Sequence, residues 1–171
     1  MDQPSPPGDD PLLSQANALV PAANAFAVGS LPQAKAEFPF MNLGANPEDA
    51  AWWTIVVTIA AVYIAATRLR NLDLGDAREG KLMAPVSNHL VELNPNALVA
   101  FDDCKEFFSR NFDALTARGH EPRFIASDSI GLWIAWNLLD RSPEVESEWG
   151  FVRAMGALVT HSFFGWWGRA H

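Results

Sequence analysis

The side chains that most often carry catalysis or bind metals are few in this chain. Its four histidines, at positions 89, 120, 161 and 171, never share a helical face at the spacing of metal ligands. Cys104 is the single cysteine, which excludes an intramolecular disulfide and a thiolate metal cluster. Because Asp102, Asp103 and Glu106 stand near it, its thiol is expected to keep its proton. The sequence predicts neither a metal centre nor a cysteine-dependent enzyme.

His161 is the one candidate ligand for a cofactor. It follows Ala157 by four residues within an apolar stretch. This spacing resembles the bacteriochlorophyll-binding helices of light-harvesting polypeptides, which makes an axial ligand to haem or bacteriochlorophyll one interpretation. Arg153 in the same stretch fits that pattern poorly, and a hydrogen-bonded or interfacial histidine is the simpler interpretation. The main interpretation of the sequence therefore requires no cofactor, with His161 kept as the alternative.

Other catalytic patterns are missing from the sequence. Neighbouring carboxylates, such as Asp102 and Asp103, point in different directions on a helix and form no catalytic dyad. The glycines build no phosphate-binding loop, and there is no Gly-x-Ser-x-Gly elbow. The chain carries 20 acidic against 12 basic side chains, a net charge of −8, which argues against nucleic acid as a partner. We therefore predict a protein that is not an enzyme.

Residues 50–67 are the element around which the rest of the chain is arranged. These eighteen residues contain no charge, no glycine and no proline, and they are about long enough to cross the hydrocarbon core of a bilayer. Asn46 is a suitable cap and Pro47 suits the first helical position, so a transmembrane helix is expected over 47–70. A buried core helix of a soluble protein is the alternative interpretation.

Aromatic and basic residues at the ends of this helix predict its orientation in a membrane. Trp52 and Trp53 stand at one end and Tyr63 near the other, where amphipathic rings favour the bilayer interface. Arg68 and Arg70 follow directly, so the positive-inside rule places the C-terminal side in the cytoplasm and the N-terminus outside. The Ala-rich, Lys-poor composition favours a bacterial protein, hence a single-pass protein of the inner membrane.

Two segments are predicted to lack regular structure. The Pro- and Ala-rich residues 1–46 are expected to form a disordered or extended N-terminal tail. Residues 71–94 are predicted to be a loop, because they are punctuated by Gly75, Pro85 and several Asp and Asn residues.

Residues 95–171 are predicted to form a small α-helical domain of about three helices, which gives a mainly α fold. The first of these helices is expected to stop at Gly119. Residues 149–167 are long enough for a second membrane crossing, but Arg153 interrupts them, and a buried or interfacial helix is favoured. The aromatic end of the chain is expected to contact the bilayer or a partner subunit through Phe163, Phe164, Trp166 and Trp167.

Four fragments stand out within residues 115–157. They are Leu115-Thr-Ala-Arg118-Gly119, Phe124-Ile-Ala126-Ser127, Leu132-Trp133-Ile-Ala135-Trp-Asn137-Leu-Leu-Asp-Arg141 and Phe151-Val152-Arg-Ala154-Met-Gly156-Ala157. Together they resemble the cytoplasmic domain of the DotM/TrbA-type subunit of the coupling complex of type IVB secretion and conjugation systems. The resemblance implies an inner-membrane subunit without catalytic activity that helps to recruit substrates.

The sequence as a whole predicts a membrane-anchored accessory or scaffolding subunit of a larger inner-membrane complex, with a secretion or conjugation apparatus as the candidate. Its expected partners are other membrane protein subunits and the lipid bilayer. The alternative is a cofactor-binding subunit of an electron-transfer or light-harvesting complex, with His161 as the ligand. A membrane enzyme whose site is shared with a partner is a third interpretation, which no residue pattern supports directly.

Overall fold

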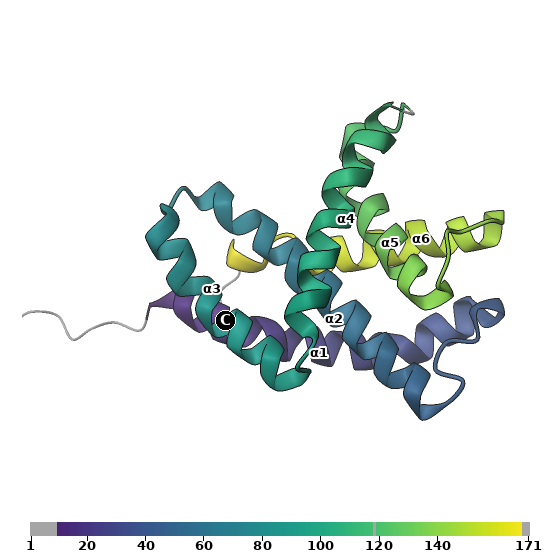
Figure 1. Cartoon of the computed structure of the whole chain (residues 1–171), viewed down its shortest axis with the longest axis horizontal. Helices are drawn as coiled ribbons and strands as arrows, with labels where there is room; N and C mark the ends of the chain where they lie inside the picture. Colours follow the sequence, from purple (N-terminus) through teal and green to yellow (C-terminus); the bar gives the residue numbers. More distant parts are fainter. Residues whose placement is uncertain (1–9, 118, 169–171) are drawn as a thin grey trace, which may run out of the picture.

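The computed structural model describes residues 10–117 and 119–168 of the chain. In this part the chain forms α-helices and single 3-10 turns and contains no strand, so the predicted mainly α fold is confirmed. The α-helices are α1 (Pro11–Glu37), α2 (Pro47–Leu69), α3 (Asp76–Leu93), α4 (Ala97–Ala117), α5 (Pro122–Leu139) and α6 (Glu146–Phe163) (Figure 1). The 3-10 turns are η1 (Pro39–Met41), η2 (Arg70–Leu72) and η3 (Trp166–Gly168).

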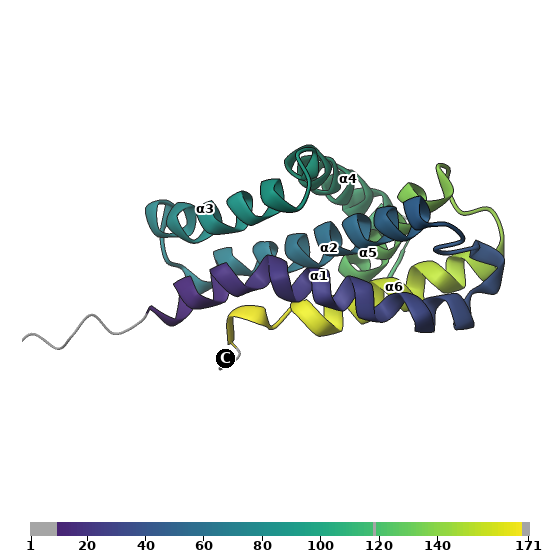
Figure 2. The same ribbon diagram turned by 90° about the horizontal axis from the view of Figure 1, so that it is seen from below.

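Helix α2 is the central element of the structure. It begins as predicted, because the Asn46 side chain accepts a hydrogen bond from the amide of Asp49 at 2.9 Å and Pro47 takes the first helical position. Every residue from 56 to 65 is buried, since α1, α4, α5 and α6 all pack against this helix. Figure 2 shows the layer of α3 and α4 on one side of α2 and α6 on the other.

The segment Pro47–Leu72 is also the one stretch, within the described residues, that is long and apolar enough to cross a membrane. Of its most apolar window, 61% is buried inside the protein. The core helix of a soluble protein meets the same criteria of length and composition. Length and apolarity therefore agree with the predicted anchor, whereas the packing is that of a core helix.

The prediction of a disordered or extended tail over residues 1–46 is wrong for most of its length. Residues Pro11–Glu37 form α1, and residues 1–9 lie outside the described part of the chain. The buried face of α1 is built mainly from alanines with Leu19 and Val20, and it packs along α2. Pro21 and Pro32 each remove a helical hydrogen bond, but burial of this face against α2 offsets that cost.

The predicted loop over 71–94 is likewise wrong, because Asp76–Leu93 form α3. Leu82, Val86 and Leu90 are buried at four-residue intervals and form the stripe that α3 turns toward its neighbours. Gly75 and Asn94 do mark the two ends of this helix, as residues favoured at helix boundaries should. Pro85 lies inside it.

Helices α4, α5 and α6 fall within the predicted domain 95–171, but they do not stand apart from the rest of the protein, since α2 packs against all three. Helix α4 ends at Ala117, and Gly119 takes a positive φ of 79° beyond it, as predicted. Figure 1 shows that the C-terminal end of α4 and the start of α5 extend together beyond the rest of the molecule.

Candidate functional site

The aromatic C-terminal segment, predicted to contact a bilayer or a partner, lies mostly inside the protein. Trp166 and Trp167 are buried in η3, and Phe163 is buried at the end of α6. The indole of Trp166 donates to the carbonyl oxygen of Gln15 at 3.0 Å, and that of Trp167 donates to the carbonyl oxygen of Ala65 at 2.8 Å. These indoles fasten the end of the chain to α1 and α2, so the predicted interface role of these three residues is corrected to an internal one.

The two tryptophans at the start of α2 have different surroundings. Trp53 is fully buried, and its indole donates to the carbonyl oxygen of Ala27 in α1 at 2.9 Å. It therefore joins α1 to α2 and cannot lie at a bilayer interface in this fold. Trp52 is 42% exposed and donates to the carbonyl oxygen of Asn137 in α5 at 2.9 Å.

The remaining predicted interface residues lie along the second half of α2 and at the end of α6. Arg68 stacks over the ring of the exposed Phe164, 3.9 Å from its centroid. Arg70 is exposed in η2. Tyr63 is only 7% exposed, and burial raises the pKa of its phenol to about 12, with the nearby Cys104 adding to the increase and Arg70 opposing it.

The predicted cofactor ligand, His161, lies on the exposed side of α6. An axial ligand needs a pocket that shields the bound macrocycle, and an exposed helix face does not supply one. Among the described residues no three His, Cys, Asp or Glu side chains gather where they could hold a metal ion. Cys104 is fully buried, and its burial, together with Asp103, raises the pKa of its thiol well above the usual value.

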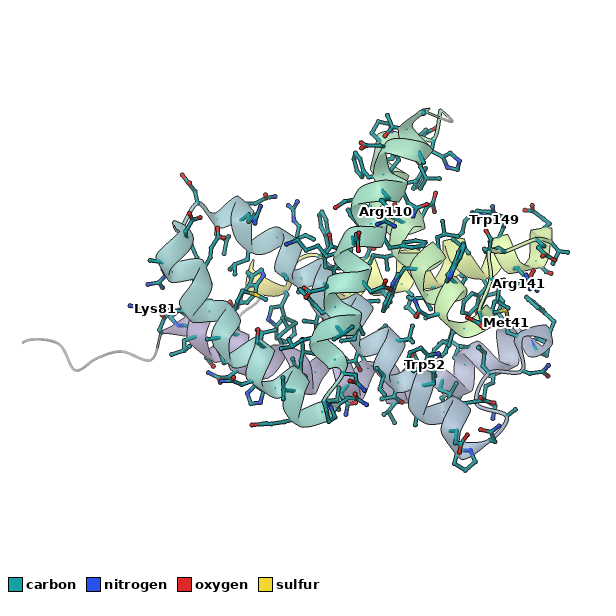
Figure 3. The ribbon with its side chains drawn as sticks, in the orientation of Figure 1. Met41, Trp52, Lys81, Arg110, Arg141 and Trp149 are labelled. Carbon is teal, nitrogen blue, oxygen red and sulfur yellow. The ribbon has the colours of Figure 1, made fainter. Side chains whose placement is uncertain are left out.

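The structure brings together a different group of aromatic residues, around an open hollow of about 620 Å³ between α4 and α5. We call it the aromatic hollow. Trp52, Trp136 and Trp149 reach it from α2, α5 and α6, and Figure 3 labels three residues of its lining, Trp52, Arg110 and Trp149. Its full lining is Trp52, Asp103, Phe107, Arg110, Asn111, Ala114, Leu115, Leu132, Trp133, Trp136, Asn137, Asp140, Ser142 and Trp149.

Two of the four tryptophans of the aromatic hollow, Trp52 and Trp136, leave much of their surface open, whereas Trp149 is partly buried. Trp136 is 44% exposed and meets Phe107 of α4 edge to face, with ring centroids 6.0 Å apart. Trp133 is buried at the base, where its indole donates to a carboxylate oxygen of Asp103 at 3.0 Å. Fully buried aromatic side chains stabilise a fold, whereas half-exposed ones gathered in one hollow are typical of surfaces that bind a partner.

The charged groups around the aromatic hollow are partly balanced. The Arg110 guanidinium donates to Glu106 one turn back on α4. Asp140 ends α5 in the left-handed conformation, with φ of 56°, and within the described part of the chain its carboxylate has no ion pair. The lining includes one hydroxyl, that of Ser142, and neither a histidine nor a cysteine. This set of side chains can stack, donate and accept hydrogen bonds, but it contains no nucleophile with an adjacent base.

The sequence predicted that Trp52 lies at a bilayer interface, whereas it lines the aromatic hollow. The other tryptophans of the hollow were not predicted as site residues. Trp136 and Trp149 stand in apolar helices, and helical spacing alone does not reveal which positions stay open to solvent. One feature of the sequence could have indicated exposed apolar side chains on α5. Helix α5 carries apolar residues all around, so some must remain at a surface unless the helix is fully enclosed.

Comparisons of the chain with protein-family models, with curated proteins and with solved structures give no significant match.

Proposed function

We propose that this protein is a non-catalytic accessory subunit of a larger assembly, and that it binds a partner protein through the aromatic hollow. The observation that carries the proposal is the meeting of Trp52, Trp136 and Trp149, from three different helices, in one open hollow. Tryptophan is the residue most enriched at the energetic centre of protein interfaces, where it fills a pocket or accepts a partner side chain. A protein with no use for these rings at its surface would be expected to bury them.

The resemblance to the DotM/TrbA-type subunit supports the same proposal. The strongest of its fragments, residues 132–141, runs through α5, and Leu132, Trp133 and Asn137 from that fragment line the aromatic hollow. A secretion or conjugation apparatus therefore remains the candidate assembly. The acidic net charge of −8 favours partners other than nucleic acid.

The membrane-anchored form of the subunit requires α2 to be a single span of a bacterial inner membrane, with residues 95–171 in the cytoplasm. Such a span would have to leave the bundle, because α1, α4, α5 and α6 cover the residues that would meet lipid. The burial of Trp53 against α1 and of Trp167 against α2 opposes that separation. We therefore propose that α2 acts as the core helix of this subunit.

Carbonate washing of cell membranes tests the placement of α2. The chain is expected to appear in the supernatant at alkaline pH, because the one candidate span among the described residues would then lie inside the bundle and not in the bilayer. Retention in the pellet after the wash, as for an integral membrane protein, would restore the single-span arrangement.

Affinity purification from native cells tests the proposed interface. A double variant, Trp136→Ala with Trp149→Ala, is expected to lose the partner that the wild-type chain retains. Phe124→Ala is the matched control, since Phe124 is 47% exposed but lies outside the aromatic hollow. Equal retention by all three proteins, or no retained partner at all, would contradict the proposal.

A further inference from the structure

A second hollow, of about 440 Å³, lies on the other face of α4, between α2, α3 and α4. The two hollows share α4 but no lining residue. Phe101, Lys105 and Ser109 of α4 face this one, whereas Asp103 and Phe107 face the aromatic hollow. We call the second one the basic hollow, because Arg70 and Lys105 both line it.

These two cations have no ion pair within the described part of the chain. Most arginines described in the structure, by contrast, are paired with a carboxylate, even though the pairs are largely exposed. The basic hollow also contains one carboxylate, that of Glu79. Two positive charges and one negative charge leave a net positive charge, which one anionic group would neutralise.

A buried phenol provides the second, independent observation. Tyr63 lines the basic hollow and is 7% exposed, yet no described residue forms a hydrogen bond with its hydroxyl. The hydroxyl oxygen is not among the fully buried polar atoms that lack a partner, so it opens to the hollow and is free to donate to a bound group. A phenol keeps its proton at neutral pH, and burial raises the pKa of this one further, to about 12, so it remains a donor. The hydroxyls of Thr67 and Ser109 differ, because they donate to backbone carbonyl oxygens of their own helices.

Apolar side chains complete the lining. Leu69, Met83 and Phe101 reach the hollow from α2, α3 and α4. A ligand that satisfies this site needs one anionic acceptor for Arg70, Lys105 and Tyr63, together with an apolar body to cover these side chains. A planar carboxylate suits the guanidinium fork of Arg70 and carries the single charge that the site lacks.

We propose that the basic hollow binds a small organic carboxylate with an apolar body, held by Arg70, Lys105 and the hydroxyl of Tyr63. This site shares no residue with the aromatic hollow, so the proposed carboxylate site and the proposed partner interface can be tested separately.

Isothermal titration of the full chain with octanoate tests this assignment. Octanoate is expected to bind with a dissociation constant in the millimolar range or tighter. Replacing both cations, by Arg70→Gln with Lys105→Gln, is expected to weaken binding by about tenfold or more, because hydrogen bonds to a charged group are lost. Tyr63→Phe removes a single donor without changing the ring, and a weakening of about fivefold is expected.

Lys81→Gln is the matched control, since Lys81 is an exposed lysine of α3 that lies away from α4 and from the basic hollow (Figure 3). It should bind octanoate as the wild type does. Octylamine, which has the same tail and the opposite charge, and inorganic phosphate, which has no tail, are both expected to bind at least about tenfold more weakly. No binding of octanoate by the wild type, equal binding by the double variant, or equal binding of octylamine or phosphate would overturn the proposal. Thermal unfolding of each variant confirms that it is folded.

Discussion

Gly131 of α5 and Gly156 of α6 face each other where these helices cross, and neither position has room for a methyl group. A Cβ atom at Gly131 would lie 1.9 Å from the carbonyl oxygen of Val152, and one at Gly156 would lie 1.9 Å from the carbonyl oxygen of Ser127. Both obstacles are backbone atoms, so no side-chain rotation relieves them. The close approach of these helices sets the position of α5 relative to α6, and with it the positions of Trp133 and Trp136 in the aromatic hollow.

Substitution of either glycine by alanine is therefore expected to destabilise the protein by about 3 kcal/mol or more, the upper end of the usual cost of overpacking. Gly150→Ala is the matched control in α6, because nothing lies within 4 Å of the added Cβ and alanine favours a helix. It should raise stability by up to about 1 kcal/mol. Urea unfolding of the three variants measures the differences. Similar midpoints for all of them would contradict the close approach.

One helix beginning and one helix end were predicted correctly from local sequence signals. The cap at Asn46 and the stop at Gly119 are local effects of side-chain and backbone chemistry, and both are found in the structure. The sequence did not predict that α1 and α3 are helices, because Pro21 and Pro85 are disfavoured inside an isolated helix. Tertiary burial against the other helices overrides that local preference, and a single sequence does not reveal it.

The candidate site was harder to predict for a related reason. Trp53 and Trp52 are adjacent in sequence and look equivalent, yet one is fully buried and the other is 42% exposed. Which face of α2 is covered depends on where α1 and α5 pack, and those contacts join residues far apart in the chain. The phenol of Tyr63 could not be assigned to the basic hollow from the sequence either, since the hollow is formed by residues of three different helices that come together only in the fold.

The different surroundings of these two tryptophans predict different costs of replacement. Trp53→Phe leaves the carbonyl oxygen of Ala27 without its indole donor and creates a void, so a loss of about 2 kcal/mol is expected. Trp52→Phe removes a hydrogen bond at an exposed site and should cost less than about 1 kcal/mol. Chemical denaturation of both variants makes the comparison. A larger loss for Trp52→Phe would argue against the packing of α1 on α2.

Removal of a buried hydroxyl in the middle of α2 is expected to increase the stability of the protein, whereas the tryptophan replacements decrease it. Thr58 is fully buried, and its Oγ1 has no hydrogen-bond partner among the described residues. Thr58→Val keeps the branched shape and removes the unsatisfied group, so it should raise stability by about 1 kcal/mol. The Thr67 hydroxyl, by contrast, donates to the carbonyl oxygen of Ile64 at 2.7 Å, and Thr67→Val should bring no gain. Thermal unfolding compares the two; a loss of stability in Thr58→Val would show that its hydroxyl is bound.

An ion pair between Arg141, which follows α5, and Glu148 of α6 makes the stability of the protein depend on pH. Arg141 donates to both carboxylate oxygens of Glu148, at 3.0 and 2.9 Å, and Glu148 also accepts from the amide of Glu144 at 3.1 Å. The Glu148 side chain is only 5% exposed. These hydrogen bonds, first that from Arg141 and then that from the Glu144 amide, hold the pKa of Glu148 below its usual value.

Because the folded protein lowers the pKa of Glu148, the unfolded chain binds more protons than the folded one in mild acid. The stabilisation is therefore complete above the ordinary glutamate pKa and is lost as the pH falls through the lower value of the folded protein. Glu148→Gln should reduce stability at neutral pH and flatten the decline of stability between neutral and acidic pH. Glu146→Gln is the control, since Glu146 pairs with Arg153 at an exposed position of the same helix, and it should leave the decline nearly unchanged. Urea unfolding across this pH range gives both profiles. A decline in Glu148→Gln as steep as in the wild type would show that other carboxylates determine the acid stability of the fold.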